Sequence, residues 1–165
     1  LDRQFDQERP LEALVTDLTY VRVDRRWAYV CLTIDFFNRE IIGLTVGWHN
    51  TAELVKQAIQ SIPYALTKAK LFHSDRGKEF DNQLIDEMLE AFGITRSLSQ
   101  AGCPYDNAVA ESAYRSFKLE FINQETFQSL KELALKTKDY VHWWNYHRIH
   151  GSLNYQTPMT KRIIA

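Results

Sequence analysis

Residues 11–21 read LEALVTDLTYV, a run of β-branched and apolar residues interrupted by one carboxylate, Asp17. Apolar side chains occupy both alternating sets of positions, which is typical of a central strand buried on both faces of a sheet. A second carboxylate, Asp75, ends the apolar run of LFHSDRGKEF at residues 71–80. An unpaired charge at the mouth of a buried strand is costly. One explanation is that Asp75 holds a cation, in which case other carboxylates should converge on it.

The hydrophobic pattern of the rest of the chain predicts a mixed sheet. Short turns separate the first three predicted strands, which favours an antiparallel meander. Strands then alternate with helices, which implies parallel additions to the sheet. We expect an α/β fold with a five-stranded mixed sheet, three strands antiparallel and two parallel, flanked by helices. The strands are predicted at 11–21, 27–35, 40–48, 69–74 and 94–99, and the helices at 82–92, 108–123, 129–147 and directly after an N-cap at Thr51.

Composition fits one globular domain of 165 residues. The 20 basic and 21 acidic side chains give a net charge of −1, whereas a nucleic-acid-binding protein usually carries a basic excess. Either a basic surface is local, or a separate DNA-binding part is missing. We interpret the polar residues 1–10 as a linker from such a missing N-terminal region and residues 11–165 as the core. No signal peptide or transmembrane run is found, so no membrane partner is expected.

Three carboxylates are candidates for a metal site. Asp17 and Asp75 would be neighbours if the first strand pairs with the fourth, and Glu111 could reach them from the helix that begins near residue 108. Clustered carboxylates repel one another unless a cation is present, and hard oxygen ligands suit Mg²⁺ or Mn²⁺. Each of the three also has an ordinary interpretation, as a strand-end, turn or solvated helix residue. Asp35 and Asp106 are alternative candidates, and spacing alone does not choose among the five.

Several motifs together resemble the catalytic core of bacterial insertion-sequence transposases of the group numbered three, which shares its core with retroviral integrases. The resemblance covers about residues 14–158 and implies a ribonuclease H-like fold with an Asp-Asp-Glu triad. The matching stretches, in chain order, are VTDLTYV, IDFFNREIIG, HSDRGKEF, GCPYDNAVAESAYRSFKLE and NYHRIHGSLNYQTP.

The resemblance assigns roles residue by residue. It places the catalytic, metal-binding triad on Asp17 in TDLTY, Asp75 in HSDRG and Glu111 in DNAVAES, and a basic residue on Lys118. Glu111 and Lys118 lie two turns apart on one helix face, so acid and base are presented together. The other residues expected to contact DNA are Asn107 and Arg115 on the same stripe, and Arg148 and His150 of the motif N-x-x-R-x-H.

The resemblance also implies the reaction and its partners. We expect DNA end cleavage followed by strand transfer, with Mg²⁺, or Mn²⁺ as a substitute, bound as two ions when DNA is present. The partners would be the transposon ends and the target DNA, in a homo-oligomer of the full-length protein. The expected location is the bacterial cytoplasm, in association with the nucleoid. The alternatives are a ribonuclease H-like nuclease without strand transfer and a non-catalytic DNA-binding or oligomerisation module.

Overall fold

One sheet runs through the middle of the computed structural model, which describes residues 8–99 and 108–165. Its strand order is β3-β2-β1-β4-β5. The first three strands are antiparallel, and β4 and β5 run parallel to β1. The predicted five-stranded mixed sheet is therefore confirmed. The strands are β1 (Ala13–Val23), β2 (Arg26–Asp35), β3 (Ile41–Gly47), β4 (Leu71–Ser74) and β5 (Thr95–Leu98).

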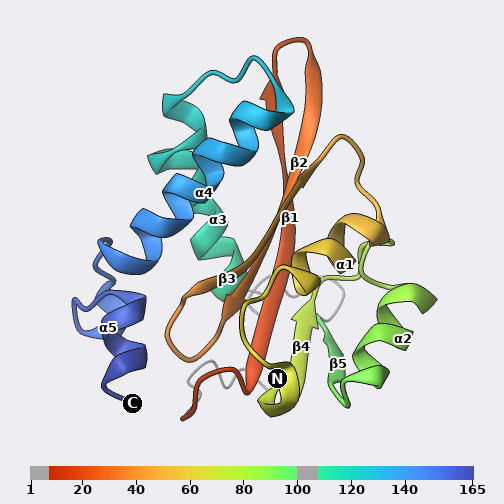
Figure 1. Ribbon diagram of the computed structural model, residues 1–165, viewed down its shortest axis with the longest axis vertical. Coiled ribbons are helices and arrows are strands. Elements are labelled where there is room, and N and C mark those ends of the chain that lie inside the picture. Colours follow the sequence, from red (N-terminus) through yellow and green to blue (C-terminus); the bar gives the residue numbers. More distant parts are fainter. Residues whose placement is uncertain (1–7, 100–107) are drawn as a thin grey trace.

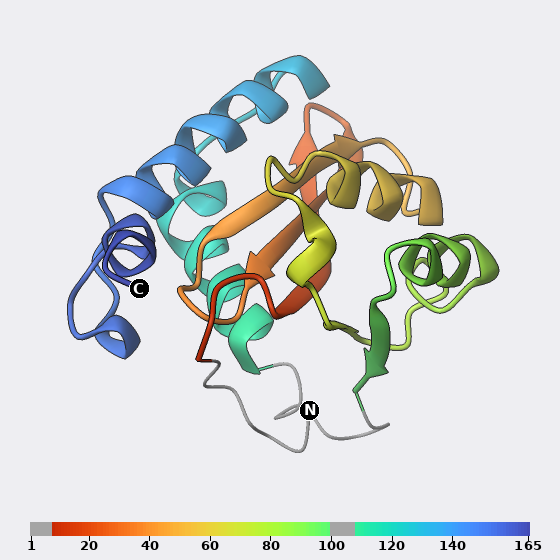
Figure 2. The same ribbon diagram turned by 60° about the horizontal axis from the view of Figure 1, so that its bottom comes forward.

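Helices cover both faces of this sheet (Figures 1 and 2). The helices α1 (Ala52–Gln60) and α2 (Gln83–Ala91) lie on one face. The helices α3 (Ala108–Glu120) and α4 (Leu130–Tyr146) lie on the other, with the short α5 (Pro158–Ile163) beside α4. Side chains of β1 alternate between two cores: Val15 packs with α3 and α4, and Leu14 packs with α1 and α2. None of the helices in the described ranges has the length and apolar character needed to cross a lipid bilayer.

Local signals set most element boundaries. The side chains of Thr51 and Ser129 cap α1 and α4, and Gly93, with φ of +68°, follows α2 in the left-handed region that favours glycine. The first strand lies two residues further along than predicted and ends at the turn Asp24–Arg25. Helix α5 was not predicted, although a Thr-Pro pair that caps and begins it is present in the sequence.

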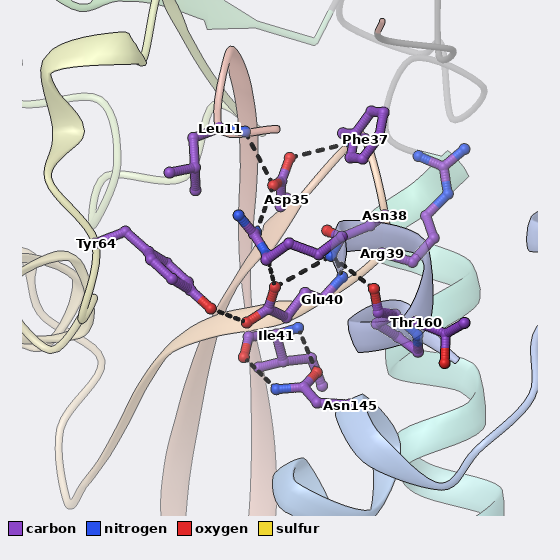
Figure 3. A network of polar contacts seen from close by, with 12 residues as sticks. Leu11, Asp35, Phe37, Asn38, Arg39, Glu40, Ile41, Tyr64, Asn145 and Thr160 are labelled. Atoms are coloured by element: carbon purple, nitrogen blue, oxygen red, sulfur yellow. Dashed lines mark hydrogen bonds and ion pairs between the residues drawn. The ribbon is translucent and has the colours of Figure 1, made fainter. Parts of the chain in front are cut away.

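A buried polar network fastens α5 to the turn between β2 and β3 (Figure 3). Asp35, Asn38 and Glu40 of this turn are all buried. The Arg162 guanidinium lies between the two carboxylates, with Nη2 2.8 Å from Asp35 Oδ2 and Nε 2.5 Å from Glu40 Oε2. The Asn38 amide donates to the Pro158 carbonyl at 2.9 Å. Because each carboxylate has a cation and further donors, the cost of burying the charges is offset.

Neighbouring side chains complete this network. The Tyr64 hydroxyl donates to Glu40 Oε1 at 2.7 Å. The Asn145 side chain of α4 both donates to and accepts from the backbone of Ile41, at 2.9 Å in each case. Asp35 Oδ1 accepts a hydrogen bond from the backbone N–H of Phe37 at 3.0 Å. This contact is typical of a turn formed by an aspartate side chain. The stretch DFFNREI therefore holds the C-terminal segment in place rather than contributing to a catalytic site.

We expect the substitution Arg162→Met to lower the free energy of unfolding by about 3 kcal/mol near neutral pH, because it leaves two buried carboxylates without their cation. Urea denaturation followed by circular dichroism measures this change. The matched control is Lys161→Met, since the Lys161 ammonium lies only over the Phe37 ring, 5.3 Å from its centroid; its effect should stay below about 1 kcal/mol. Equal denaturation midpoints for the two variants would contradict the assignment.

Candidate active site

Two aspartates lie where strand β4 ends. Val15 of β1 pairs with His73 of β4 in parallel, and this is the last pair between the two strands. Continuing the same register by two residues places Asp17 opposite Asp75, which directly follows β4. Strand β1 extends eight residues beyond the last pair, so its edge is not covered by β4 from Thr16 onward. The expected pairing of the first and fourth strands is confirmed, and it brings the two aspartates to one end of the sheet.

Asp17 is half-buried, and its Oδ1 accepts a hydrogen bond from the Leu18 backbone N–H at 2.7 Å. The pKa of Asp17 is raised to about 7, mainly by burial and in smaller steps by the charges of Asp75, Glu111 and Glu79. The Leu18 hydrogen bond acts in the opposite direction. Without a cation, Asp17 is therefore only partly ionised at neutral pH, and the other carboxylates are near enough to influence it.

Tyr114 holds the helix of Glu111 against β1. Its buried hydroxyl accepts from the Leu32 backbone N–H at 2.7 Å and donates to the Asp17 carbonyl, so it bonds both central strands. Glu111 lies three residues earlier on α3, about one helical turn away, and its side chain is exposed. Tyr114 was not among the site residues expected from the sequence. Its hydroxyl fixes the position of Glu111's helix relative to the strand that carries Asp17.

The loop after β4 positions Asp75. Asp75 Oδ1 accepts a hydrogen bond from the Gly77 backbone N–H at 2.8 Å. The carboxylate therefore also stabilises a local turn, which is the ordinary interpretation given for it from the sequence. Arg76 points elsewhere, with Nε donating to the Ser99 carbonyl at 2.9 Å. His73 is buried and its Nδ1 lies 2.9 Å from Ser97 Oγ, a packing and hydrogen-bonding position beside the site.

Glu79 is a fourth carboxylate near the site, and sequence analysis missed it. Its charge contributes to the raised pKa of Asp17, and its Oε1 accepts from the Asn50 side chain at 3.2 Å. A Cβ at Gly77 would lie 2.7 Å from Glu79 Cδ, so the absence of a side chain at Gly77 lets the carboxylate approach. The sequence offered a signal in RGKE directly after Asp75, where the glycine precedes the glutamate by two positions.

These carboxylates are coupled electrostatically without forming a complete ligand set. Within residues 8–99 and 108–165, no group of three or more His, Cys, Asp or Glu side chains is arranged so that it could hold a metal ion. The donor chemistry nevertheless fits a hard divalent cation, since all the donors are carboxylate oxygens and their mutual repulsion raises the pKa of Asp17. Glu111 is the exposed member and the one free to reorient.

The residues expected to contact DNA differ in accessibility. Arg115 is exposed one turn after Glu111. Lys118 is half-buried, with its ammonium 5.0 Å from the centroid of the Tyr20 ring. Asn107 lies outside the described residues, as does the alternative carboxylate Asp106.

Arg148 and His150 are occupied within the fold. Two nitrogens of the Arg148 guanidinium contact the Glu120 carboxylate at 2.6 and 2.8 Å, and the guanidinium lies 4.5 Å from the centroid of the Trp144 ring. His150 is buried, and its Nδ1 lies 3.2 Å from Arg148 Nη1. Burial, and secondarily the Arg148 charge, lower the pKa of His150 to about 4, so it is neutral at physiological pH. This arrangement favours a structural role over a direct phosphate contact for His150.

Solved structures share this fold. The HTLV-2 integrase catalytic core domain, solved in complex with magnesium, is 15% identical with a TM-score of 0.64, over 94% of this chain and 98% of that one. A simian T-cell lymphotropic virus intasome, solved with the PP2A regulatory subunit B56 gamma, contains a chain that is 11% identical with a TM-score of 0.77, over 95% of this chain and 56% of that one.

The sequence of this chain also matches curated relatives and family models. Transposase InsF for insertion sequence IS3A of Escherichia coli is 29% identical over 160 residues, which is 93% of this chain and 56% of the relative. The transposase of insertion sequence element IS629 of Shigella sonnei is 30% identical over 159 residues, 96% of this chain and 54% of the relative. The chain thus spans about half the length of these relatives. Residues 92–158 match one model described as integrase core domain, and residues 7–104, more than half of the chain, match another. The chain therefore belongs to the integrase core domain family.

Proposed function

We propose that this chain is the catalytic domain of a DNA transposase that cleaves element ends and transfers the resulting strands. The observation that carries the proposal is the electrostatic coupling of Asp17 with Asp75 and Glu111 at the carboxyl end of β4. Both curated relatives described above are named transposases. Phosphoryl transfer needs concentrated positive charge at the phosphate, and a site built from carboxylates supplies it only by binding cations.

Asp17, Asp75 and Glu111 would hold Mg²⁺, or Mn²⁺ in its place, as two ions once DNA phosphate oxygens complete the ligand sets. When bound, these ions stabilise negative charge on the phosphate and on the attacking and leaving oxygens. Holding them requires Asp17 to lose its proton and Glu111 to swing toward the aspartates. The solved HTLV-2 integrase core contains magnesium, which supports this choice of ion.

The reaction has two displacement steps at phosphorus. Water first attacks the phosphodiester at the element end, its oxygen bonds to phosphorus, and the bond to the 3′ oxygen breaks to leave a 3′-hydroxyl. That hydroxyl then attacks a second phosphodiester and displaces its 3′ oxygen. Arg115 and Lys118 hold the DNA phosphates beside the site from one face of α3, with Asn107 on the same stripe. Arg148 would contact a DNA phosphate only if its guanidinium left the Glu120 carboxylate.

The full-length protein would act as a homo-oligomer, because two DNA ends must be held together for transfer. We place the reaction in the bacterial cytoplasm, at the nucleoid, where DNA is available. Residues 1–10 would link this core to an N-terminal DNA-binding region that selects the ends.

Triad variants test the assignment. We expect Asp75→Asn and Glu111→Gln each to reduce strand transfer at least about 1,000-fold, because each removes a charged metal ligand worth several kcal/mol in the transition state. The assay supplies a pre-cleaved DNA end with a 3′-hydroxyl, a plasmid target and Mg²⁺, and circular dichroism verifies the fold. Glu87→Gln, an exposed acidic residue of α2, is the matched control. Full joining activity in a triad variant would refute the catalytic role of that residue. If the wild type cuts DNA without joining it, the alternative of a ribonuclease H-like nuclease is favoured.

Asp17 gives a prediction about stability that needs no DNA. A carboxyl whose pKa is raised on folding favours the folded state only while protonated, so its ionisation destabilises the fold as pH rises. With chelator present, we expect Asp17→Asn to become more stable than wild type progressively between about pH 4 and 7, and to keep an advantage of roughly 2 to 4 kcal/mol above that.

Urea denaturation at pH 4, 6 and 8.5 measures the pH dependence, and Asp139→Asn, at an exposed aspartate of α4, is the control that should show no such trend. Adding Mn²⁺ should stabilise the wild type and leave Asp17→Asn unchanged, because a ligand of the folded state stabilises it by mass action. A constant difference between wild type and Asp17→Asn across this pH range would contradict the raised pKa.

A further inference from the structure

Two aromatic side chains stand exposed on the hairpin formed by β1 and β2. Tyr20 is 58% exposed and Trp27 is 50% exposed, and their ring centroids lie 5.1 Å apart in an edge-to-face arrangement. Arg22 is directly opposite Trp27 in the strand register, so Tyr20 and Trp27 are diagonal neighbours on one face of the hairpin. Figure 1 shows the hairpin extending past α1, which leaves this part of the face uncovered.

Cations accompany both rings. The Lys118 ammonium lies 5.0 Å from the Tyr20 centroid, and the Arg22 guanidinium lies 5.3 Å from the Trp27 centroid. We call these four residues, Tyr20, Arg22, Trp27 and Lys118, the hairpin patch. They line a hollow of about 420 Å³, together with residues that include Glu125. The Glu125 carboxylate is bound by the Lys136 ammonium at 2.7 Å, so the hairpin patch keeps its positive character.

Exposed aromatic faces interleaved with cations are the chemistry that binds unpaired nucleotides. Every base has a π face that stacks on an aromatic ring, and cations attract the phosphates that link the bases. Inside a duplex each base is stacked on both faces, so a ring can stack only on a base that has left the helix or on the outermost pair at an end. The Lys118 contact with Tyr20 does not block this, because an exposed cation–π contact is weaker than base stacking on a ring.

The hairpin patch lies close to the carboxylates. Tyr20 follows Asp17 by three residues of β1, about 10 Å along the strand, and its side chain leaves the opposite face of the strand. The Lys118 ammonium of α3, 5.0 Å from the Tyr20 centroid, connects the two faces around the edge of β1 that β4 leaves open. Lys118 follows Glu111 by seven residues of α3, again about 10 Å. A DNA strand advances about 3.4 Å per nucleotide in a duplex, so 10 Å corresponds to about three nucleotides. A strand whose phosphate meets the carboxylates can therefore bring a nearby base to the rings.

We propose that the hairpin patch binds an unpaired base of the DNA strand within about three nucleotides of the phosphate that is cut. Tyr20 and Trp27 supply the stacking faces, and Lys118 leaves the Tyr20 ring to contact the adjacent phosphate. This inference rests on the proposed function for the identity of the DNA, but base binding itself requires no catalysis.

Binding of short single strands tests the inference in low salt with chelator present. The probes are fluorescently labelled octathymidylate and an eight-unit strand of abasic sites, which carries the phosphates without the bases, and anisotropy gives the dissociation constants. The wild type should bind octathymidylate at least about tenfold more tightly than the abasic strand. Equal affinity for the two probes would overturn the proposal, because backbone charge alone would then explain binding.

Variants locate the binding surface. Tyr20→Leu and Trp27→Leu should each weaken octathymidylate binding about tenfold and leave abasic-strand binding unchanged, whereas Trp27→Phe keeps a ring and should restore most of the affinity. Trp143→Leu, which removes a 41% exposed tryptophan on α4, is the matched control and should have no effect. Circular dichroism confirms that each variant is folded. Unchanged octathymidylate binding in both folded leucine variants would overturn the proposal.

A triad variant separates this inference from the proposed function. Asp75→Asn should keep the wild-type preference for octathymidylate over the abasic strand, because Asp75 lies outside the hairpin patch, while loss of its charge strengthens binding of both probes alike. If the wild type shows the base-dependent binding but no strand transfer, the proposed function fails and the hairpin patch stands. If strand transfer proceeds and binding ignores the bases, the hairpin patch fails and the proposed function stands.

Discussion

The short parallel pairing of β1 with β4 is the constraint on which the site depends. Only Ala13–Val15 of β1 are covered by β4, and the strand then continues with that edge open. The end of β4 delivers Asp75 to this edge at the level of Asp17, and the open edge leaves room for side chains from α3. Ligands of open α/β sheets bind at the carboxyl ends of parallel strands for the same reason. A longer β4 would extend the pairing past Asp17 and cover the open strand edge beside it.

Two strand carboxylates show how surroundings decide between structure and chemistry. Burial raises the pKa of both Asp17 and Asp35. Asp35 receives an arginine, Arg162, and two backbone N–H groups, so its charge is satisfied inside the fold. Asp17 receives one backbone N–H, and the charged groups that shift its pKa are all carboxylates. The fold thus satisfies the charge of Asp35 and leaves half-buried Asp17 without a cationic partner among the described residues. Storing unfavourable charge at a site meant to bind ions is consistent with the cost that functional sites place on stability.

The sequence predicted the features that local patterns encode. Alternating apolar residues, the cap at Thr51 and the glycine at Gly93 set the elements, and the short turns set the antiparallel order of the first three strands. The structure added contacts between residues distant in the chain, such as Arg162 with Asp35 and the Tyr114 hydroxyl with the β1 backbone. Such partners lack a periodic signal, because their pairing depends on how whole layers pack. Glu79 is a similar case, since its place near the site depends on the loop that brings its carboxylate beside Gly77 and Asn50.

The charge distribution makes binding of DNA and of metal ions interdependent. The net charge of −1 conceals a separation in which carboxylates gather at the end of β4 and cations lie along one face of α3. A phosphate drawn in by Arg115 or Lys118 meets repulsion from Asp75 and Glu111 unless a cation neutralises them. A cation held by these carboxylates would in turn lack a full set of oxygen ligands until phosphate arrives. Each partner therefore raises the affinity of the other by the same factor, as linkage requires. On the proposed function, a core of almost zero net charge would bind DNA at the carboxylates more tightly when metal is bound, which would couple substrate capture to readiness for chemistry.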